Sequence, residues 1–320
     1  MEQHLFTWNY LIAIYLFTAG LSSGAGMIAG VTEILNNTSD RIKRISAYLA
    51  PFPVMLGLLM LVADLHRPWN FFQVLIHYHV TSVMSWGAFF LLVFPIFALI
   101  FAAMVYFNYQ GALRKLFAWL ELVLGLAIGI YAGLLLAAIY NNPVWSNPLI
   151  AFLFFVSAIS TGICMIILGG KVWDQTETFI RKIMPAKLQP EKWLPEQISL
   201  NFDHNIIRRL IGIDAVIIII ELMVISTLII SYMLRPTGDI ALGAIITGGY
   251  YLTFWIGVVL LGLTLPLVLG ILELRDRFSD NMNLIVSIAE PILVLTGGFI
   301  LRWVVVYGGQ LVYPILTFYS

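Results

Sequence analysis

The sequence has few charged residues and a single cysteine, and both shortages exclude classes of protein. Only 11% of its 320 residues are Asp, Glu, Lys or Arg, whereas 61% are hydrophobic. Soluble domains carry roughly 25% charged residues, so a soluble globular core is excluded. Cys164 alone can neither hold an iron–sulfur cluster, which needs about four thiolates, nor form an internal disulfide. The zero net charge gives no indication of a nucleic-acid partner.

Histidines at membrane depth and phosphate-binding loops are also missing. The five histidines fall in predicted loops or at predicted interfaces: His4, His66, His77, His79 and His204. A membrane haem requires axial histidines on facing helices, so we predict no haem. There is no Gly-rich loop followed by Lys and Ser/Thr, and no metal-ligand spacing on a helix face. The pair His77 and His79 favours an interfacial or partner-facing loop over a metal site.

Long apolar blocks dominate what remains. A block of about 18 or more apolar residues with few charges is typical of a membrane-spanning helix. We expect eight such helices, at 10–34, 45–64, 82–107, 117–140, 149–170, 211–234, 243–272 and 284–305. The sequence therefore predicts an all-α integral membrane protein in a lipid bilayer. The charged segment 171–209 divides the helices into two sets of four, which predicts one four-helix bundle over 1–140 and a second over 141–320.

The distribution of Lys and Arg between the loops predicts the orientation. Fourteen fall on one side: Arg41, Lys43, Arg44, Arg114, Lys115, Lys171, Arg181, Lys182, Lys187, Lys192, Arg208, Arg209, Arg275 and Arg277. We place three on the other side: Arg67, Arg235 and Arg302. Because cytoplasmic loops carry the excess of positive charge, both termini are expected outside, in the periplasm if the protein lies in a cytoplasmic (inner) membrane.

Four carboxylic acids lie deep inside the predicted helices, away from their ends: Glu121, Asp214, Glu221 and Glu290. Ionisable residues at membrane depth are functional candidates, because a carboxylate in hydrocarbon must stay protonated or find a partner. Glu221 lies roughly 18 Å past Arg209 along its helix, near the middle of a ~30 Å apolar core. The four acids could form a proton path from the inner side to the midplane. Alternatively, they tie helix faces together by hydrogen bonds.

Polar groups also gather near the outer ends of the second and fourth helices. Asp64, His66 and Arg67 form either a structural cluster or a site at which Arg67 anchors an oxygen and His66 exchanges protons. Tyr131 lies between Gly129 and Gly133 in the outer half of its helix. Its hydroxyl must find a partner at that depth, which is either a quinone carbonyl or a neighbouring backbone group.

Small residues recur in the first helix at spacings of four, as in the pairs Gly20/Gly24 and Gly26/Gly30. This spacing is typical of close helix packing in membranes. A smooth glycine face could also admit a flat ring, so a ligand role stays open as a second interpretation.

Four stretches then stand in a characteristic order: Tyr15-Leu16-Phe17 through Gly20-Leu21-Ser22-Ser23-Gly24; Asp64-Leu65-His66-Arg67-Pro68; Ser82-Val83-Met84-Ser85-Trp86-Gly87; and Gly297-Gly298-Phe299-Ile300-Leu301-Arg302 with Gly308-Gly309-Gln310. In this order and within eight helices, they resemble the NrfD/PsrC family of membrane subunits of polysulfide reductase and related complexes. The third stretch, from Ser82, and the fourth, from Gly297, indicate no chemistry. We interpret them as sites of close packing and of docking at the outer surface.

The resemblance implies an eight-helix subunit without a redox centre, which binds menaquinone or ubiquinone near the outer face. It also implies two partners on the outer side, an iron–sulfur subunit with four [4Fe–4S] clusters and a molybdopterin catalytic subunit. By resemblance, Tyr131 is the tyrosine expected at the quinone. Tyr15 stands where some relatives have histidine, and Asp64 and Arg67 match the motif that ends the second helix.

The function we predict is quinol oxidation by the membrane subunit of a respiratory oxidoreductase. Tyr131 would bond one quinone oxygen, while His66, Asp64 or Tyr15 handles the other oxygen or its proton. Quinone reduction is the same chemistry in reverse. Two alternatives stay open, a proton-coupled transporter and a passive membrane anchor without a quinone site.

Overall fold

The computed structural model describes residues 8–35, 39–64, 82–183, 204–275 and 280–316, and in these ranges every regular element is a helix. The predicted all-α fold is confirmed. The elements are α1 (Tyr10–Leu35), α2 (Asp40–Leu49), α3 (Pro51–Asp64), α5 (Val83–Tyr106), α6 (Ala112–Ala137), α7 (Leu149–Ile183), α8 (His204–Met233), α9 (Gly238–Ile245), η5 (Thr253–Thr264), α10 (Leu265–Leu274) and α11 (Asp280–Leu316). Eight helices of the described ranges are long and apolar enough to cross a membrane.

Two of the predicted membrane spans are not single continuous α-helices. The span predicted at 45–64 consists of α2 and α3, which meet at Pro51. Proline has no N–H to donate to the preceding turn, so the helix breaks there. The span predicted at 243–272 is preceded by the separate short helix α9, and it crosses as η5, a π-helix, followed by α10.

The last helix is longer than predicted, and this corrects the position of Arg302. We expected a span at 284–305 with Arg302 at its outer end, among the loop charges. Instead α11 continues to Leu316, with an apolar span over Ile285–Val312. Arg302 therefore lies roughly 15 Å inside the end of that span, half of a ~30 Å apolar core. It is 1% exposed and belongs to the protein interior.

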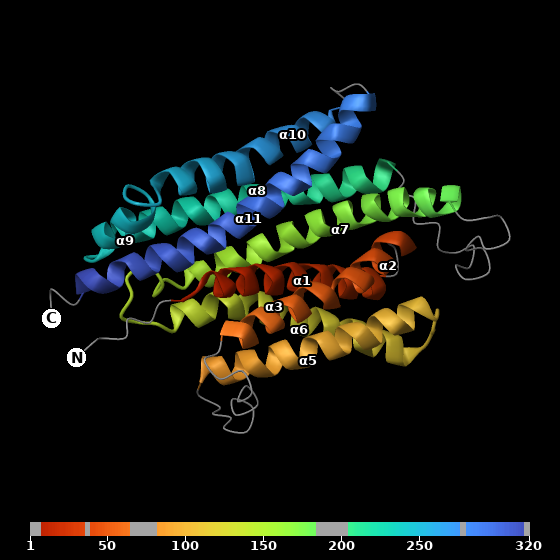
Figure 1. The fold of residues 1–320 in the computed structure, drawn as a ribbon, viewed down its shortest axis with the longest axis horizontal. Coiled ribbons are helices and arrows are strands. Elements are labelled where there is room, and N and C mark those ends of the chain that lie inside the picture. Colours follow the sequence, from red (N-terminus) through yellow and green to blue (C-terminus); the bar gives the residue numbers. More distant parts are fainter. Residues whose placement is uncertain (1–7, 36–38, 65–81, 184–203, 276–279, 317–320) are drawn as a thin grey trace.

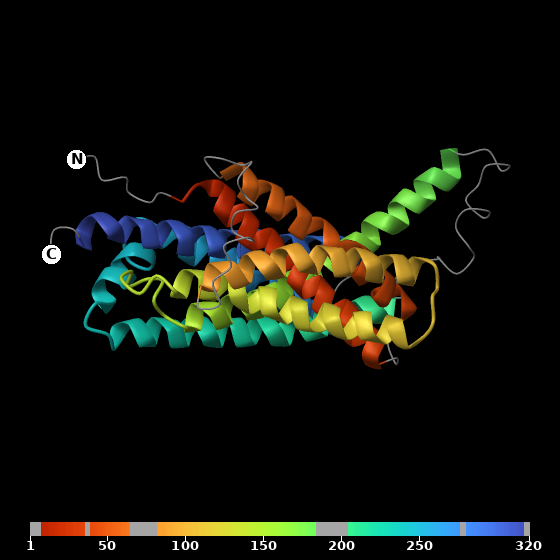
Figure 2. The same cartoon turned by 90° about the horizontal axis from the view of Figure 1, so that it is seen from below.

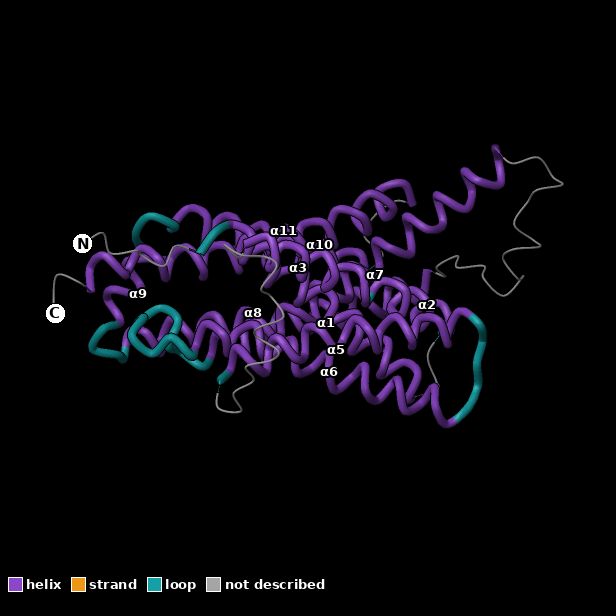
Figure 3. Tube along the Cα trace, turned by 60° about the horizontal axis from the view of Figure 1, so that its bottom comes forward, coloured by secondary structure: helices purple, strands orange, loops and turns teal. Residues whose placement is uncertain are grey.

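The helices lie side by side along the long axis of the molecule, and both termini emerge at the same end (Figure 1). The view from below in Figure 2 and the trace in Figure 3 show the α5–α6 turn at the opposite end. The first helix, α1, packs against α3, α6, α7 and α11, and α7 packs against α6, α8 and α11. Because the two halves share these contacts, the division into two four-helix bundles stays a prediction.

Glycines allow the close helix contacts that this arrangement needs. A Cβ atom built on Gly24 of α1 would lie 2.0 Å from the carbonyl oxygen of Ala158 on α7. A Cβ on Gly297 of α11 would lie 2.2 Å from the Cα of Gly262 on η5. Both helix pairs could approach this closely only without a side chain. The packing interpretation of the α1 glycines is confirmed at Gly24, and Gly297 of the fourth stretch has the same role.

Candidate functional site

Two tyrosines from distant parts of the sequence meet between α1 and α6. The phenol groups of Tyr15 and Tyr131 lie close enough to interact with each other. Tyr15 is 1% exposed and Tyr131 is 6% exposed. A phenol hydroxyl is both a donor and an acceptor, so each can satisfy the other in an apolar interior. The structure thus brings together the two tyrosines that the sequence singled out separately.

Glycines on two further helices make room for these rings. A Cβ on Gly87 of α5 would lie 1.6 Å from Cζ and 2.0 Å from the hydroxyl oxygen of Tyr131. A Cβ on Gly57 of α3 would lie 3.5 Å from the Tyr15 ring and 2.4 Å from Oγ1 of Thr18. Tyr131 therefore seats its phenol in a notch that only glycine leaves open. Gly87 belongs to the stretch Ser82–Gly87, for which the sequence indicated no chemistry, and its missing side chain makes room for the Tyr131 phenol.

The tyrosine pair lies near the end of the molecule that carries the termini. Tyr15 is five residues past the start of α1, and Tyr131 is six residues before the end of α6. These distances correspond to roughly 8 and 9 Å along the helices. Asp64, the last residue of α3, lies at the same end and is partly exposed. His66 and Arg67 lie outside the described residues.

A second polar cluster lies between α7 and α8. Asp214 and Glu221 are seven residues apart on α8 and so project from one face. The Oγ of Ser160 donates to Asp214 at 2.7 Å, and the thiol of Cys164 approaches the same carboxyl group at 3.5 Å. Ser157, one turn earlier on α7, lies close enough to Glu221 for the two side chains to interact. Ser157, Ser160 and Cys164 are spaced three and four residues apart and therefore form a polar stripe along α7.

Glu290 extends this cluster across α11 and towards the end opposite the termini. It interacts electrostatically with Asp214 on α8 and with Glu273 on α10. Lys171 of α7 donates to Ser287 of α11 and interacts with both of these glutamates. Asp214, Glu221 and Glu290 therefore belong to one chain of polar groups.

Arg302 closes this chain of polar groups on the side of α1. Its Nε donates to the carbonyl oxygen of Leu16 at 3.2 Å, and Nη1 donates to Oγ of Ser157 at 3.3 Å and to the Gly298 carbonyl at 2.8 Å. It also interacts with Glu221. A Cβ on Gly20 would lie 2.6 Å from Nη2, so glycine makes room here too. Buried in this way, an arginine requires the carboxylate and carbonyls that surround it.

Glu121 lies apart from the other three acids. It is fully buried on α6 against α1 and α5, where a Cβ on Gly26 would meet both its Oε1, at 3.1 Å, and the ring of Phe94. Neither of its carboxyl oxygens has a hydrogen-bond partner among the described residues. Three of the four acids therefore lie in one cluster and Glu121 lies in a separate apolar site, and the predicted proton path stays a prediction.

Sequence reasoning missed Arg302, Gly87 and the α7 stripe. A signal for the stripe was present, because Ser157, Ser160 and Cys164 follow a helical spacing of three and four. The sequence signal for Gly87 was weaker: an isolated glycine in an apolar helix indicates that a neighbouring helix approaches closely. Arg302 had no signal of burial in the sequence, because a charged residue near the end of an apolar block usually belongs to a loop.

Comparisons with known proteins agree with this architecture. The family described as "Polysulphide reductase, NrfD" matches residues 1–188 and 200–314. One of the chains of polysulfide reductase from Wolinella succinogenes is 30% identical, over 97% of this protein and 96% of that one. The Protein NrfD homolog of Haemophilus influenzae is 27% identical, over 95% and 94%. One of the subunits of selenate reductase from Mesobacillus selenatarsenatis is 24% identical, over 94% and 73%.

The similarity covers nearly the whole sequence and includes all eight apolar helices. The family expected from four short stretches is therefore confirmed. This chain is a multi-pass membrane protein that belongs to the polysulphide reductase NrfD family.

Proposed function

We propose that the protein is the quinone-binding membrane subunit of a respiratory oxidoreductase, in which it exchanges electrons between menaquinol or ubiquinol and a docked iron–sulfur subunit. The observation that most supports this is the buried phenol pair of Tyr15 and Tyr131, seated on Gly87 near the end of four helices. The family membership supports the same proposal, because the relatives from Wolinella succinogenes and Mesobacillus selenatarsenatis are named as parts of polysulfide reductase and selenate reductase.

The residues at this site fit a quinone head group. Each of the two phenols carries one O–H proton that it can donate. Either proton is available to a carbonyl oxygen, the only strong hydrogen-bonding group that a quinone presents. Gly87 lets the Tyr131 phenol lie directly against α5, and both tyrosines belong to the apolar core. Such a site is mostly apolar with few convergent polar groups, as small-molecule sites usually are.

The protein residues would perform three tasks at this site. Tyr131, held by Gly87, donates a hydrogen bond to one quinone oxygen and fixes the orientation of the ring. Asp64 or His66, which end or follow α3, would accept the proton that leaves the other oxygen. Tyr15 on α1 would bond that oxygen, or pass the proton on by giving up its own. The quinone itself supplies the two-electron chemistry when bound, and the electrons pass to the partner subunit. We assign the tyrosines to binding and Asp64 with Arg67 to the same outer region.

The polar groups of the second half suit proton transfer to this region. Glu290, Asp214 and Glu221 lie in order from the end opposite the termini towards Arg302, which bonds the backbone of α1 one residue from Tyr15. With the termini outside, as the Lys and Arg distribution predicts, this route would start at the cytoplasmic side of an inner membrane. Quinone reduction would take up protons along this route, and quinol oxidation would release protons along it in the opposite direction, so turnover would move charge across the membrane. Glu121, without a polar partner among the described residues, has no place in this route.

The proposal includes partners at the end of the molecule that carries the termini. Two relatives are named as a chain of polysulfide reductase and a subunit of selenate reductase. We infer from these names that a separate subunit carries out catalysis. We infer a four-cluster iron–sulfur subunit docked beside the tyrosine site and a molybdopterin subunit attached to it.

Quinol-driven reduction of the partner's clusters, followed by optical spectroscopy in membranes, tests the proposal. We expect Tyr131→Phe to assemble normally and to lose at least about tenfold in reduction rate, the usual cost of ~1.4 kcal/mol for one lost hydrogen bond. Tyr232→Phe is the matched control. It also removes a buried phenol, whose hydroxyl donates to the Val144 carbonyl at 2.6 Å in the second half. If Tyr131→Phe reduces the clusters at the wild-type rate, the protein is a passive anchor or binds quinone elsewhere.

A further inference from the structure

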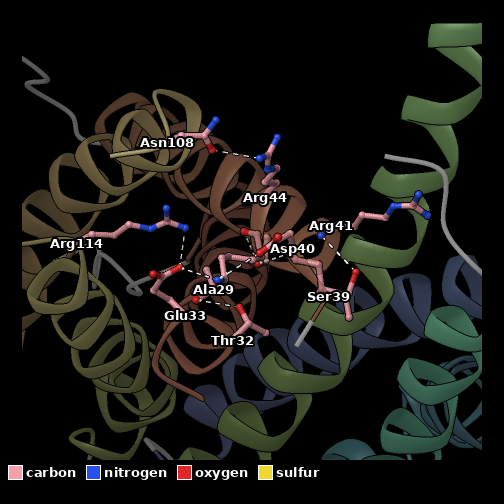
Figure 4. Close-up of polar contacts among 12 residues, drawn as sticks. Ala29, Thr32, Glu33, Ser39, Asp40, Arg41, Arg44, Asn108 and Arg114 are labelled. Atoms are coloured by element: carbon pink, nitrogen blue, oxygen red, sulfur yellow. Dashed lines mark hydrogen bonds and ion pairs between the residues drawn. The ribbon is translucent and has the colours of Figure 1, made fainter. Parts of the chain in front are cut away.

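A large charged cavity lies at the end of the molecule opposite the termini, far from the tyrosine site along α1. It is an open cleft with a volume of about 1270 Å³, lined by the end of α1, the start of α2, the α5–α6 turn and the start of α6. Figure 4 shows the polar side chains that converge there. Four cations and two carboxylates line it: Lys43, Arg44, Arg114, Lys115, Glu33 and Asp40.

One carboxylate holds two of the cations in place. The Oε2 of Glu33 lies 3.1 Å from Nζ of Lys43 and 2.7 Å from Nη2 of Arg114. These side chains are only 7 to 12% exposed. The triad joins α1, α2 and α6, and two cations facing one carboxylate keep an excess of positive charge at the cavity wall. Asp40 reaches Lys43 as well, at 3.6 Å, but its side chain is 80% exposed and largely hydrated.

The α5–α6 turn aims Arg44 across the cavity. Asn108 adopts a left-handed backbone conformation with φ of 51°, which asparagine tolerates better than most residues. The N–H of Tyr109 donates to the Met104 carbonyl at 2.9 Å and closes the turn. In this fixed position the Asn108 side chain accepts from Nη2 of Arg44 at 3.1 Å, as Figure 4 shows. This solvent-exposed hydrogen bond links the Arg44 guanidinium on α2 to the α5–α6 turn.

Two further groups add positive potential. Lys115 lines the cavity and forms no ion pair with any described residue. The N-terminus of α6 begins at Ala112, and its cap residue Gly111 offers no side-chain oxygen to the first N–H groups. Those N–H groups and the helix dipole attract anions.

The surface next to the cavity is apolar and suited to acyl chains. Directly after Lys115, α6 exposes a stripe with helical spacing: Leu116, Trp119, Val123 and Leu126, each 43 to 57% exposed. At the end of α5 and in the adjoining turn, Tyr106, Phe107 and Tyr109 are 45 to 77% exposed, as aromatic residues are at a membrane interface. A soluble phosphate would use only the charged cavity, whereas a phospholipid would use both the cavity and the stripe.

We propose that this cavity binds the phosphate headgroup of an anionic phospholipid whose acyl chains lie along the α6 stripe. Arginine and lysine side chains recognise the phosphodiester oxygens through charge-assisted hydrogen bonds. Basic pockets between membrane helices on the cytoplasmic side are known to hold anionic headgroups, and the cavity lies at the end where the Lys and Arg excess predicts the cytoplasm. The lipid would tie α1, α2 and α6 together at their common end, independently of the quinone site.

The test uses the purified complex, stripped of lipid in detergent and titrated with phosphatidylglycerol while bound lipid is counted by native mass spectrometry. We expect phosphatidylglycerol to bind at least about tenfold more tightly than phosphatidylcholine, since surface cations contribute roughly fivefold in affinity each. Inorganic phosphate at the same concentration should not displace it. Equal binding of the two lipids, or displacement by inorganic phosphate, overturns the proposal whatever the variants do.

Variants locate the binding. Arg44→Gln with Lys115→Gln leaves the buried Glu33 triad intact and should weaken phosphatidylglycerol binding by about 20-fold. The charge-conserving pair Arg44→Lys with Lys115→Arg should restore most of it. Arg209→Gln with Arg275→Gln removes two exposed charges at the same end but outside the cavity, and should change affinity less than about twofold. If this control weakens binding as much as the cavity variant, no localised site exists.

Discussion

Nε of Arg302 donates to the carbonyl oxygen of Leu16 at 3.2 Å, across 286 residues of sequence. The bond ties the last membrane helix to the first, at the residue that follows Tyr15. The same guanidinium bonds Ser157 on α7 and interacts with Glu221 on α8. Its position is the point at which the polar groups of the second half reach the helix that carries one of the two site tyrosines.

Replacing Arg302 should therefore destabilise the subunit. In Arg302→Met the Leu16 carbonyl and Glu221 lose a buried charged partner, and removal of one member of such a network costs on the order of 3–5 kcal/mol. Arg302→Lys keeps the charge but cannot reproduce the three bonds of the planar guanidinium, so we expect an intermediate loss. Thermal unfolding of the purified complex measures both. A midpoint for Arg302→Met equal to wild type would mean that these contacts contribute nothing to stability.

The clustered acids should control proton movement without controlling assembly. Glu221→Gln and Glu290→Gln keep the shape of each side chain but can no longer release a proton. We expect cluster reduction to continue while the number of protons moved per electron falls, and membrane vesicles with a pH-sensitive dye report that ratio. An unchanged ratio in both variants would remove these acids from any proton route.

Glu121 should behave differently from that cluster, because the structure places it in an apolar site. Glu121→Met replaces a carboxyl group that lacks hydrogen-bond partners among the described residues by an apolar side chain of similar length. Such replacements are often neutral or stabilising by about 1–3 kcal/mol. We expect an unfolding midpoint at or above that of wild type and an unchanged proton ratio. A lowered proton ratio in this variant would return Glu121 to the route.

The helices could be predicted because their signal is local. A run of about 20 apolar residues is sufficient to recognise a span, and α1 and α5 begin and end within one residue of the expected positions. The α2–α3 break at Pro51 was not predicted, since hydropathy averages over it. The end of α11 was misplaced because Arg302 interrupts the apolar run. The burial of Arg302 depends on the carbonyl of Leu16, 286 residues away, which hydropathy cannot indicate.

The candidate site was predicted residue by residue but not as an assembly. Tyr131, Tyr15 and Asp64 were each identified, yet nothing local indicates that the two phenols face each other or that Gly87 holds one of them. The three-acid cluster needed the facing stripe of α7, whose serines and cysteine are not distinctive singly. Which faces of two helices meet depends on their rotation about their own axes, and a single sequence shows that only indirectly.

The space that Gly87 leaves for the Tyr131 ring leads to a prediction about whether the position of that ring matters for electron transfer. In Gly87→Ala the new Cβ would stand 1.6 Å from the Tyr131 ring, so the ring must move. A displacement of about 1 Å at a reacting group costs up to roughly 100-fold in rate. We therefore expect quinol-driven cluster reduction to fall at least about tenfold in a complex that still assembles. Gly243→Ala is the matched control, because a Cβ there meets nothing within 4 Å. Should Gly87→Ala and Gly243→Ala both retain the wild-type rate, the position of Tyr131 has no part in electron transfer. A loss in Gly87→Ala that Tyr131→Phe does not share would instead assign the notch to the quinone ring itself.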